Sequence, residues 1–254
     1  MLEEYFEKNK DRIDKLIRES KYPLTAKLLD RFYSKNSSIS NVIQSVTEND
    51  DYVVFILFRS FIEHFIVNLY IWLKFTIDQN DETAKKYYND YCTQETLKRL
   101  RYNKQNNVDY DPFEKTLNSI IEYLTKNGII TQKSTEKLNI SANQFDIRKI
   151  AKFILKNLPE NQPTFFNKEK IKYMLDYYNH LSSNIHGGPW SDLVFYEYKG
   201  KYVTDEIQHI KKLCKGSLAI HRFYILYFLA HEFSDIKTDI ITEMDKYDNE
   251  NNIE

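Results

Sequence analysis

Residues 52–77 read YVVFILFRSFIEHFIVNLYIWLKFTI, and this stretch decides the fold. It is apolar on nearly every side of a helix, a pattern typical of a helix at the centre of a protein. It also contains Arg59, Glu63, His64 and Lys74, and charged side chains are costly in the middle of a bilayer. The stretch therefore predicts a buried core helix in a soluble protein, with no membrane as partner.

The segments on either side of this helix are also predicted to be helical. Apolar residues recur at helical spacing over residues 2–21, 24–33, 39–46, 81–103, 112–127, 145–158, 167–186, 205–213 and 217–246. The one β signal is a pair of short runs, 193–198 and 201–204, around the turn Lys199-Gly200. The fold is therefore predicted to be mainly α, with one small β-hairpin at about 193–204.

No linker or internal repeat divides the chain. We expect one α-helical domain over residues 1–247, in which N-terminal helices occupy 1–50, a central core occupies 51–189, and the hairpin and C-terminal helices occupy 190–247. The polar residues 248–254 are expected to form a disordered tail.

Glycine and proline are scarce, with five of each among 254 residues. A β-sandwich or β-barrel needs many turns that these residues supply, and no glycine-rich phosphate-binding pattern is present, so no cofactor is expected. Cys92 and Cys214 are too far apart in sequence for a zinc motif, which leaves no expected metal site and fits a reduced cytoplasm. The net charge of −1 leaves any nucleic-acid contact to a local patch.

Two predicted helices carry a basic patch of this kind. The patches consist of Lys98, Arg99, Arg101 and Lys104 with Tyr102, and of Arg148, Lys149, Lys152 and Lys156. Each patch is either a solvated helix face or a row that follows RNA phosphates, where Tyr102 can stack on a base. A steep salt dependence of RNA binding would favour the second interpretation.

Two charges of the central helix lie on the same side of it. Arg59 and Glu63 are four residues apart, so both side chains project from one face of a helix that is otherwise apolar. Charges in such surroundings must be paired or serve a function. They are interpreted either as an ion pair that orients two helices or as part of a site.

A second group of polar residues ends a later helix. Residues 177–189 read YYNHLSSNIHGGP. At helical spacing Tyr178, Ser182 and His186 form one stripe, with Asn179 beside it, and the glycine pair that follows ends the helix. A phenol, a hydroxyl and an imidazole on one stripe favour a polar pocket. The alternative is purely structural, with a small packing serine and a histidine that caps the helix.

Together these two groups of residues resemble the HEPN-like superfamily. The resemblance rests on Arg59 and Glu63 in the apolar helix and on the run Tyr178-x-x-Leu181-Ser182-x-x-x-His186. It covers about residues 51–189. In particular, the chain is similar to a bacterial branch, catalogued as a domain of unknown function, with a Y-x-x-L-S-x-x-x-H signature.

The resemblance implies an all-α bundle that is commonly dimeric and occurs in toxins, antiphage abortive-infection systems and RNA-processing modules. Its active members are metal-independent ribonucleases with an R-x(4–6)-H motif near the dimer interface. His186 would take the histidine position, but positions 179–181 hold Asn, His and Leu instead of the motif's arginine. If the two central helices pack side by side, Arg59 supplies the missing cation and Glu63 orients it or His186.

The expected site therefore has His186, Arg59 and Glu63 in catalytic roles, with phosphate held by Tyr178, Ser182, Asn184 and Asn179. The leading interpretation is a cytoplasmic RNA-targeting toxin or antiphage-defence effector. It would be a homodimer whose partners are RNA and a protein of a defence or toxin–antitoxin system. One alternative is a non-catalytic HEPN-like module for binding or dimerisation that recognises a partner protein or a small ligand. Another is that the polar residues form only a buried structural network.

Overall fold

The computed structural model describes residues 2–46, 51–105, 126, 140–158, 168–185, 201–234, 237–239 and 242. Helices account for 93% of the interpretable residues, and no strand occurs among them. The prediction of a mainly α protein is therefore confirmed.

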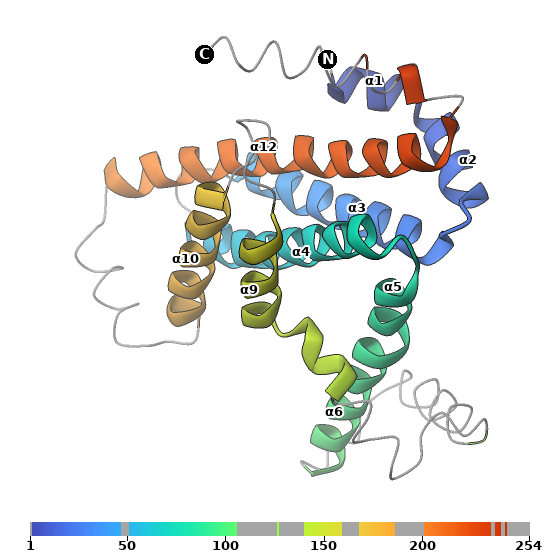
Figure 1. The fold of residues 1–254 in the computed structure, drawn as a ribbon. Coiled ribbons are helices and arrows are strands. Elements are labelled where there is room, and N and C mark those ends of the chain that lie inside the picture. Colours follow the sequence, from blue (N-terminus) through green and yellow to red (C-terminus); the bar gives the residue numbers. More distant parts are fainter. Residues whose placement is uncertain are drawn as a thin grey trace.

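The arrangement follows from one central helix and the helices around it (Figure 1). The elements are α1 (Leu2–Lys8), α2 (Lys10–Glu19), α3 (Pro23–Ser45), α4 (Asp51–Asp78), α5 (Glu82–Lys86), the π-helix η1 (Tyr87–Tyr91), α6 (Cys92–Gln105), the 3-10 helix η2 (Asn143–Phe145), α9 (Ile147–Asn157), α10 (Lys168–Ile185) and α12 (Lys201–Glu232). Helices α3, α4 and α12 run alongside one another, while α9 and α10 lie side by side and cross them.

Helix α4 lies at the centre, as its apolar sequence predicts. Phe58, Phe61, Phe65 and Leu69 are completely buried, and α3, α9, α10 and α12 all pack against α4. Within the described ranges it is also the one helix with the length and composition of a membrane span, but 61% of that apolar window is buried inside the protein. This burial is consistent with the core helix of a soluble protein.

Helix α3 is one continuous helix, although the polar residues 34–38 predict a break between two shorter ones. The break does not occur because the polar side chains find partners without leaving the helix. The Asn36 amide is completely buried and donates to the Phe61 carbonyl oxygen at 3.1 Å. The Ser38 hydroxyl donates to the Ser34 carbonyl oxygen one turn earlier at 3.0 Å. Tertiary packing therefore overrides the local preference of these residues for loops.

The start of α3 is capped by a residue from another part of the chain. The Asp81 carboxylate accepts hydrogen bonds from the Leu24 amide (3.1 Å), the Thr25 amide (2.9 Å) and the Thr25 hydroxyl (2.7 Å). The first amides of a helix have no partner within it, and the helix dipole favours negative charge there. Asp81 thus joins the start of α3 to the segment that follows α4.

Two other predicted helices are divided in the structure. The segment 2–21 forms α1 and α2, which meet at Asn9, where the side-chain amide donates to the Tyr5 carbonyl oxygen (2.9 Å). The segment 81–103 forms α5, η1 and α6, with one π-helical turn between the two α-helices. That turn packs Tyr87 against Phe32, with ring centroids 5.6 Å apart.

Helix α12 replaces three predicted elements. Residues 201–204, predicted as the second strand of a hairpin, form its first turn, so that prediction is wrong. Their β-branched and aromatic side chains favour a strand. That preference is outweighed because adding residues to the end of an existing helix costs less free energy than pairing a short strand. The two predicted helices 205–213 and 217–246 are one helix up to Glu232, whose carboxylate accepts hydrogen bonds from Ser20 and the Lys21 amide.

Gly216 lies inside α12, where a glycine weakens a helix. A Cβ added there would meet nothing within 4 Å, so Gly216→Ala is expected to raise the free energy of unfolding by about 0.5–1 kcal/mol. Urea unfolding followed by circular dichroism measures the change, and Lys215→Ala, at the exposed neighbouring position, serves as the control. A loss of stability in Gly216→Ala would mean that α12 is not continuous at this residue.

Several predictions fall outside the described residues. These are the first strand of the hairpin (193–198) with its turn, nearly all of the helix at 112–127, and the tail at 248–254. The helix predicted at 145–158 corresponds to α9, and the one at 167–186 corresponds to α10.

Candidate functional site

Four of the predicted site residues come together where α4 meets α10. The Arg59 guanidinium donates to the Ser182 hydroxyl through Nε (2.9 Å), to the Tyr178 hydroxyl through Nη2 (3.1 Å) and to Glu63 Oε2 through Nη1 (3.4 Å). We call these four residues the Arg59 cluster. Two pairs of residues, each spaced by one helical turn, thus face each other across a helix–helix contact.

The apolar side of α10 explains why these polar edges meet. Ile171, Met174 and Leu181 are buried, and the Tyr177 ring lies edge-on against Phe58 of α4 with centroids 5.6 Å apart. Residues that follow this apolar stripe by one position lie at its border. Tyr178 and Ser182 are in that position, so packing of the apolar stripe brings their hydroxyl groups to the edge of α4.

The Arg59 cluster is half-buried and remains open to solvent. The side chains of Arg59 and Glu63 are 24% and 38% exposed. The guanidinium carbon also lies 4.8 Å from the centre of the Tyr178 ring, a cation–π distance. Of the five N–H groups on a guanidinium, the two left on the terminal nitrogens have no partner among the described residues. They remain free to donate to an external acceptor, for which a phosphate oxygen is well suited.

Two tyrosines, Tyr178 of the Arg59 cluster and Tyr91, which is affected by the charge of Glu63, stay protonated at neutral pH. Burial raises the pKa of Tyr178, and the negative charge of Glu63 raises it further, while Arg59 and the hydrogen bond with Ser182 act in the opposite direction. Burial, with the charges of Glu95 and Glu63, raises the pKa of Tyr91 to about 12. Tyr178 therefore offers a neutral hydroxyl that accepts from Arg59 and keeps its own proton to donate.

The other predicted site residues are not part of these contacts. Asn179 is exposed, and no hydrogen bond of the Arg59 cluster within the described ranges involves it. Asn184 belongs to α10, but its side chain lies outside the described residues. His186 also lies outside them, directly after Ile185, the last residue of α10. Its place in the site stays a prediction.

A second polar cluster lies in the core between α3, α4 and α12. His221 is completely buried, and its ring nitrogens contact the Asn36 amide (Nε2, 3.0 Å) and the Asn68 amide (Nδ1). A neutral imidazole has one donor and one acceptor, so one asparagine must present its oxygen. Asn36 uses its nitrogen for the Phe61 carbonyl oxygen, which leaves the Asn68 oxygen to accept from Nδ1–H.

This core network has a structural role because all three side chains are sealed from solvent. The signal that could have found it is Asn68, an amide in the most apolar part of the central helix. A buried amide needs a partner, and a histidine in another apolar helix can provide one.

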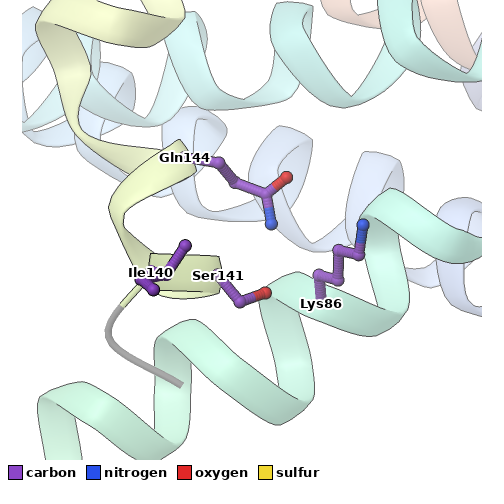
Figure 2. A pocket seen from close by; sticks show the side chains of 4 residues that line it. All are labelled: Lys86, Ile140, Ser141 and Gln144. Atoms are coloured by element: carbon purple, nitrogen blue, oxygen red, sulfur yellow. The ribbon is translucent and has the colours of Figure 1, made fainter. Parts of the chain in front are cut away.

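A hollow of about 290 Å³ lies on other helices, between α5 and the residues before α9. Figure 2 shows the Gln144 amide, the Ser141 hydroxyl and the Lys86 ammonium around it, with Ile140 at its edge. Ser141 is held by a hydrogen bond to Asp90, while the Gln144 nitrogen is buried without a partner in the described part of the chain. This hollow contains none of the residues of the Arg59 cluster.

Among the described residues, no three His, Cys, Asp or Glu side chains are grouped as a metal site would require. Comparison with known protein families, with curated proteins and with solved structures finds no match to this chain.

Proposed function

We propose that this protein is an RNA-targeting effector of the HEPN-like type, acting as a toxin or in antiphage defence by cleaving RNA without a metal. The observation that carries the proposal is the half-buried Arg59 guanidinium, held by Tyr178 and Ser182, with one N–H on each terminal nitrogen that has no partner among the described residues. In sequence, His186 comes four residues after Ser182, which is the spacing of one helical turn.

These residues match the needs of RNA cleavage in which the 2′-oxygen attacks the neighbouring phosphorus. His186 removes the proton from the 2′-hydroxyl as the new P–O bond forms, and it then returns that proton to the 5′-oxygen as the old P–O bond breaks. The products are a 2′,3′-cyclic phosphate and a 5′-hydroxyl. Arg59 stabilises the negative charge that builds up on the phosphate oxygens in between.

The remaining members of the Arg59 cluster act as positioning residues in this proposal. Glu63, Tyr178 and Ser182 each hold one nitrogen of the guanidinium, which fixes the direction of its free N–H groups. Asn184 and the exposed Asn179 border the same helix end and would contact the phosphate or sugar. A homodimer, with a protein of the same defence or toxin–antitoxin system as regulator, completes the proposal.

The alternative is a non-catalytic HEPN-like module that binds a partner protein or a small ligand. Two observations favour it: positions 179–181 carry no arginine, and Arg59 already has a partner at each nitrogen. In that case the cluster recognises an anionic group but transfers no proton.

The experiment that separates the two is cleavage of labelled single-stranded RNA by the purified protein in excess EDTA. The wild type should form 2′,3′-cyclic phosphate ends, and His186→Ala should lower the rate by about 10²–10⁴-fold, the usual contribution of a general acid–base. His180→Ala is the matched control because it removes an exposed histidine of α10 and should cleave normally. Equal cleavage by the His186→Ala variant and the wild type contradicts the catalytic role of His186. RNA binding without cleavage by the wild type favours the alternative.

A further inference from the structure

Four exposed lysines among the described residues are paired with an acid on their own helix. Lys15, Lys85, Lys98 and Lys172 each lie within 4 Å of a glutamate three or four residues away. Such local pairs neutralise the charge of the lysine at the surface. A helix that departs from this pattern presents a concentrated positive field instead.

Helix α9 has no acid of its own to form such a pair. Its sequence, IRKIAKFILKN, contains four basic residues and no acid. Lys149, Lys152 and Lys156 are exposed, and their ammonium groups have no hydrogen bond or ion pair with any residue in the described ranges. Arg148 has a distant contact with the helix cap Asp146 (3.7 Å) and remains 87% exposed. We call these four basic residues the α9 basic face.

The four side chains share one side of the helix. Because each residue advances about 100° around an α-helix, positions 148, 149, 152 and 156 fall within an arc of about 100°. The opposite side is buried against α4. Ile150 and Ile154 are completely buried, and the Phe153 ring packs edge-on against Tyr70 with centroids 5.2 Å apart. The apolar side of α9 is therefore occupied and is not available to enter a lipid bilayer, as a membrane-binding amphipathic helix requires.

The α9 basic face is close to the Arg59 cluster. Helices α9 and α10 lie side by side on α4 (Figure 1) and contact each other. The pKa of Tyr178, raised mainly by burial, is also raised by the negative charge of Asp146 at the start of α9. The first turn of α9 is thus within electrostatic reach of the cluster, and the basic face extends away from it along the helix.

From this arrangement we infer that the α9 basic face binds the phosphate backbone of single-stranded RNA and leads the strand to the Arg59 cluster. Exposed, unpaired lysines on one helix face suit a polyanion whose charges repeat along its length. The second half of the inference, delivery to the cluster, rests on the proposed function. The binding itself does not depend on whether the strand is then cleaved.

The test measures RNA binding as a function of salt with a fluorescent single-stranded RNA of about 20 nucleotides, longer than a typical single binding site. All proteins carry His186→Ala so that the RNA stays intact. The triple variant Lys149→Gln/Lys152→Gln/Lys156→Gln should bind about 10- to 50-fold more weakly at physiological salt. The slope of log K against log salt should fall by about 2, since each lost phosphate contact contributes about 0.7. The matched control neutralises three acid-paired lysines, Lys15, Lys85 and Lys172, and should bind nearly as tightly as the parent.

Equal RNA binding by the triple variant and the parent overturns the inference, even if the wild type cleaves RNA. Equal loss in the control also overturns it, because net charge rather than α9 would then decide binding. If these lysines are needed for binding to vesicles that contain phosphatidylserine, and no RNA binds, then the ligand of the α9 basic face is a membrane. That result overturns the inference as well. If the lysines control RNA binding but the wild type does not cleave, the inference stands and the proposed ribonuclease activity fails.

Discussion

Lowering the pH from 7 to 5 is expected to reduce the free energy of unfolding by about 2 kcal/mol through His221 alone. Burial above all, with smaller electrostatic contributions from His64 and Arg222, lowers the pKa of this histidine from 6.5 to about 3. In the unfolded chain the ring binds a proton near pH 6.5, so below that pH the unfolded state holds one proton more than the folded state. The contribution of His221 is therefore complete above pH 6.5 and is lost as the pH falls towards 3.

The hydrogen-bond network gives a second reason why the folded protein rejects this proton. A charged imidazole has two N–H donors and no acceptor. The Asn36 amide nitrogen lies 3.0 Å from His221 Nε2 and also donates to the Phe61 carbonyl oxygen. Protonation would therefore place the new N–H of the His221 ring opposite the N–H of the Asn36 amide, with no acceptor between them. Asn36 cannot turn its oxygen to the ring without losing its hydrogen bond to the Phe61 carbonyl oxygen.

Other buried groups modify the pH dependence. Burial, with the charges of Lys35 and Arg31, lowers the pKa of His64 to about 4, which acts in the same direction but more weakly because His64 is partly exposed. Burial raises the pKa of Asp30 and Glu206 above 3.8 and 4.5. These carboxyl groups bind protons more readily in the folded state, so they stabilise it as the pH falls. The His221 contribution must therefore be isolated by a substitution.

Urea unfolding between pH 7 and pH 5 measures the effect. In His221→Gln, which keeps a donor and an acceptor in the core, the loss of stability over this range should shrink by about 2 kcal/mol, whatever the stability of the variant at pH 7. His180→Gln, at an exposed position, should leave the loss unchanged. An identical pH dependence in His221→Gln and the wild type would contradict the assignment of the effect to His221.

Local patterns in the sequence predict the central helix and the spacing within each half of the candidate site. The apolar run 52–77 matches α4 to within one residue at each end, because a long run that is apolar on nearly every side of a helix identifies a core helix without information about its partners. The four-residue spacings of Arg59 with Glu63, and of Tyr178 with Ser182, likewise follow from helix geometry.

The contacts between these elements could not be predicted because they depend on which helix faces meet. Asn36 is part of a polar run that resembles a loop, yet its partners are Phe61, 25 residues away, and His221, 185 residues away. When those tertiary partners are not known, the polar run 34–38 predicts a break between two helices. Residues 201–204 resemble a strand for a similar reason: their helical state is determined by the long apolar stripe that follows them. Short segments therefore mislead where tertiary contacts outweigh local preference.

Removing both charges of the Arg59 cluster is expected to lower RNA cleavage by at least about 100-fold while leaving the protein folded. The double substitution Arg59→Met/Glu63→Leu removes the cation that would stabilise the phosphate, and loss of one such group commonly lowers rates by about 10²–10³-fold. It leaves no unpaired charge behind. Replacing a partly buried ion pair with apolar residues of similar size is often neutral for stability, so the free energy of unfolding should change by about 1 kcal/mol or less.

The same helix provides a matched control. Lys74 and Asp78 form a second ion pair on α4 with the same four-residue spacing, an N–O distance of 2.6 Å, and side chains 23% and 33% exposed. The variant Lys74→Met/Asp78→Leu should change stability by a similar amount and leave cleavage unaffected. Comparison of the two variants separates the effect of losing an ion pair from the effect of losing this particular one.

The two interpretations of the Arg59 cluster then give opposite results. If it is only a structural network, the double variant should be destabilised more than the Lys74–Asp78 control, since Tyr178 and Ser182 lose their partner, and RNA cleavage by the fraction that remains folded should be normal. If it is a site, stability should match the control and cleavage should be lost. Arg59→Lys refines the second case: a lysine keeps the charge but cannot hold two hydroxyl groups and a carboxylate at fixed angles. Partial cleavage by this variant would identify charge as the main contribution, and complete loss would identify the geometry of the guanidinium.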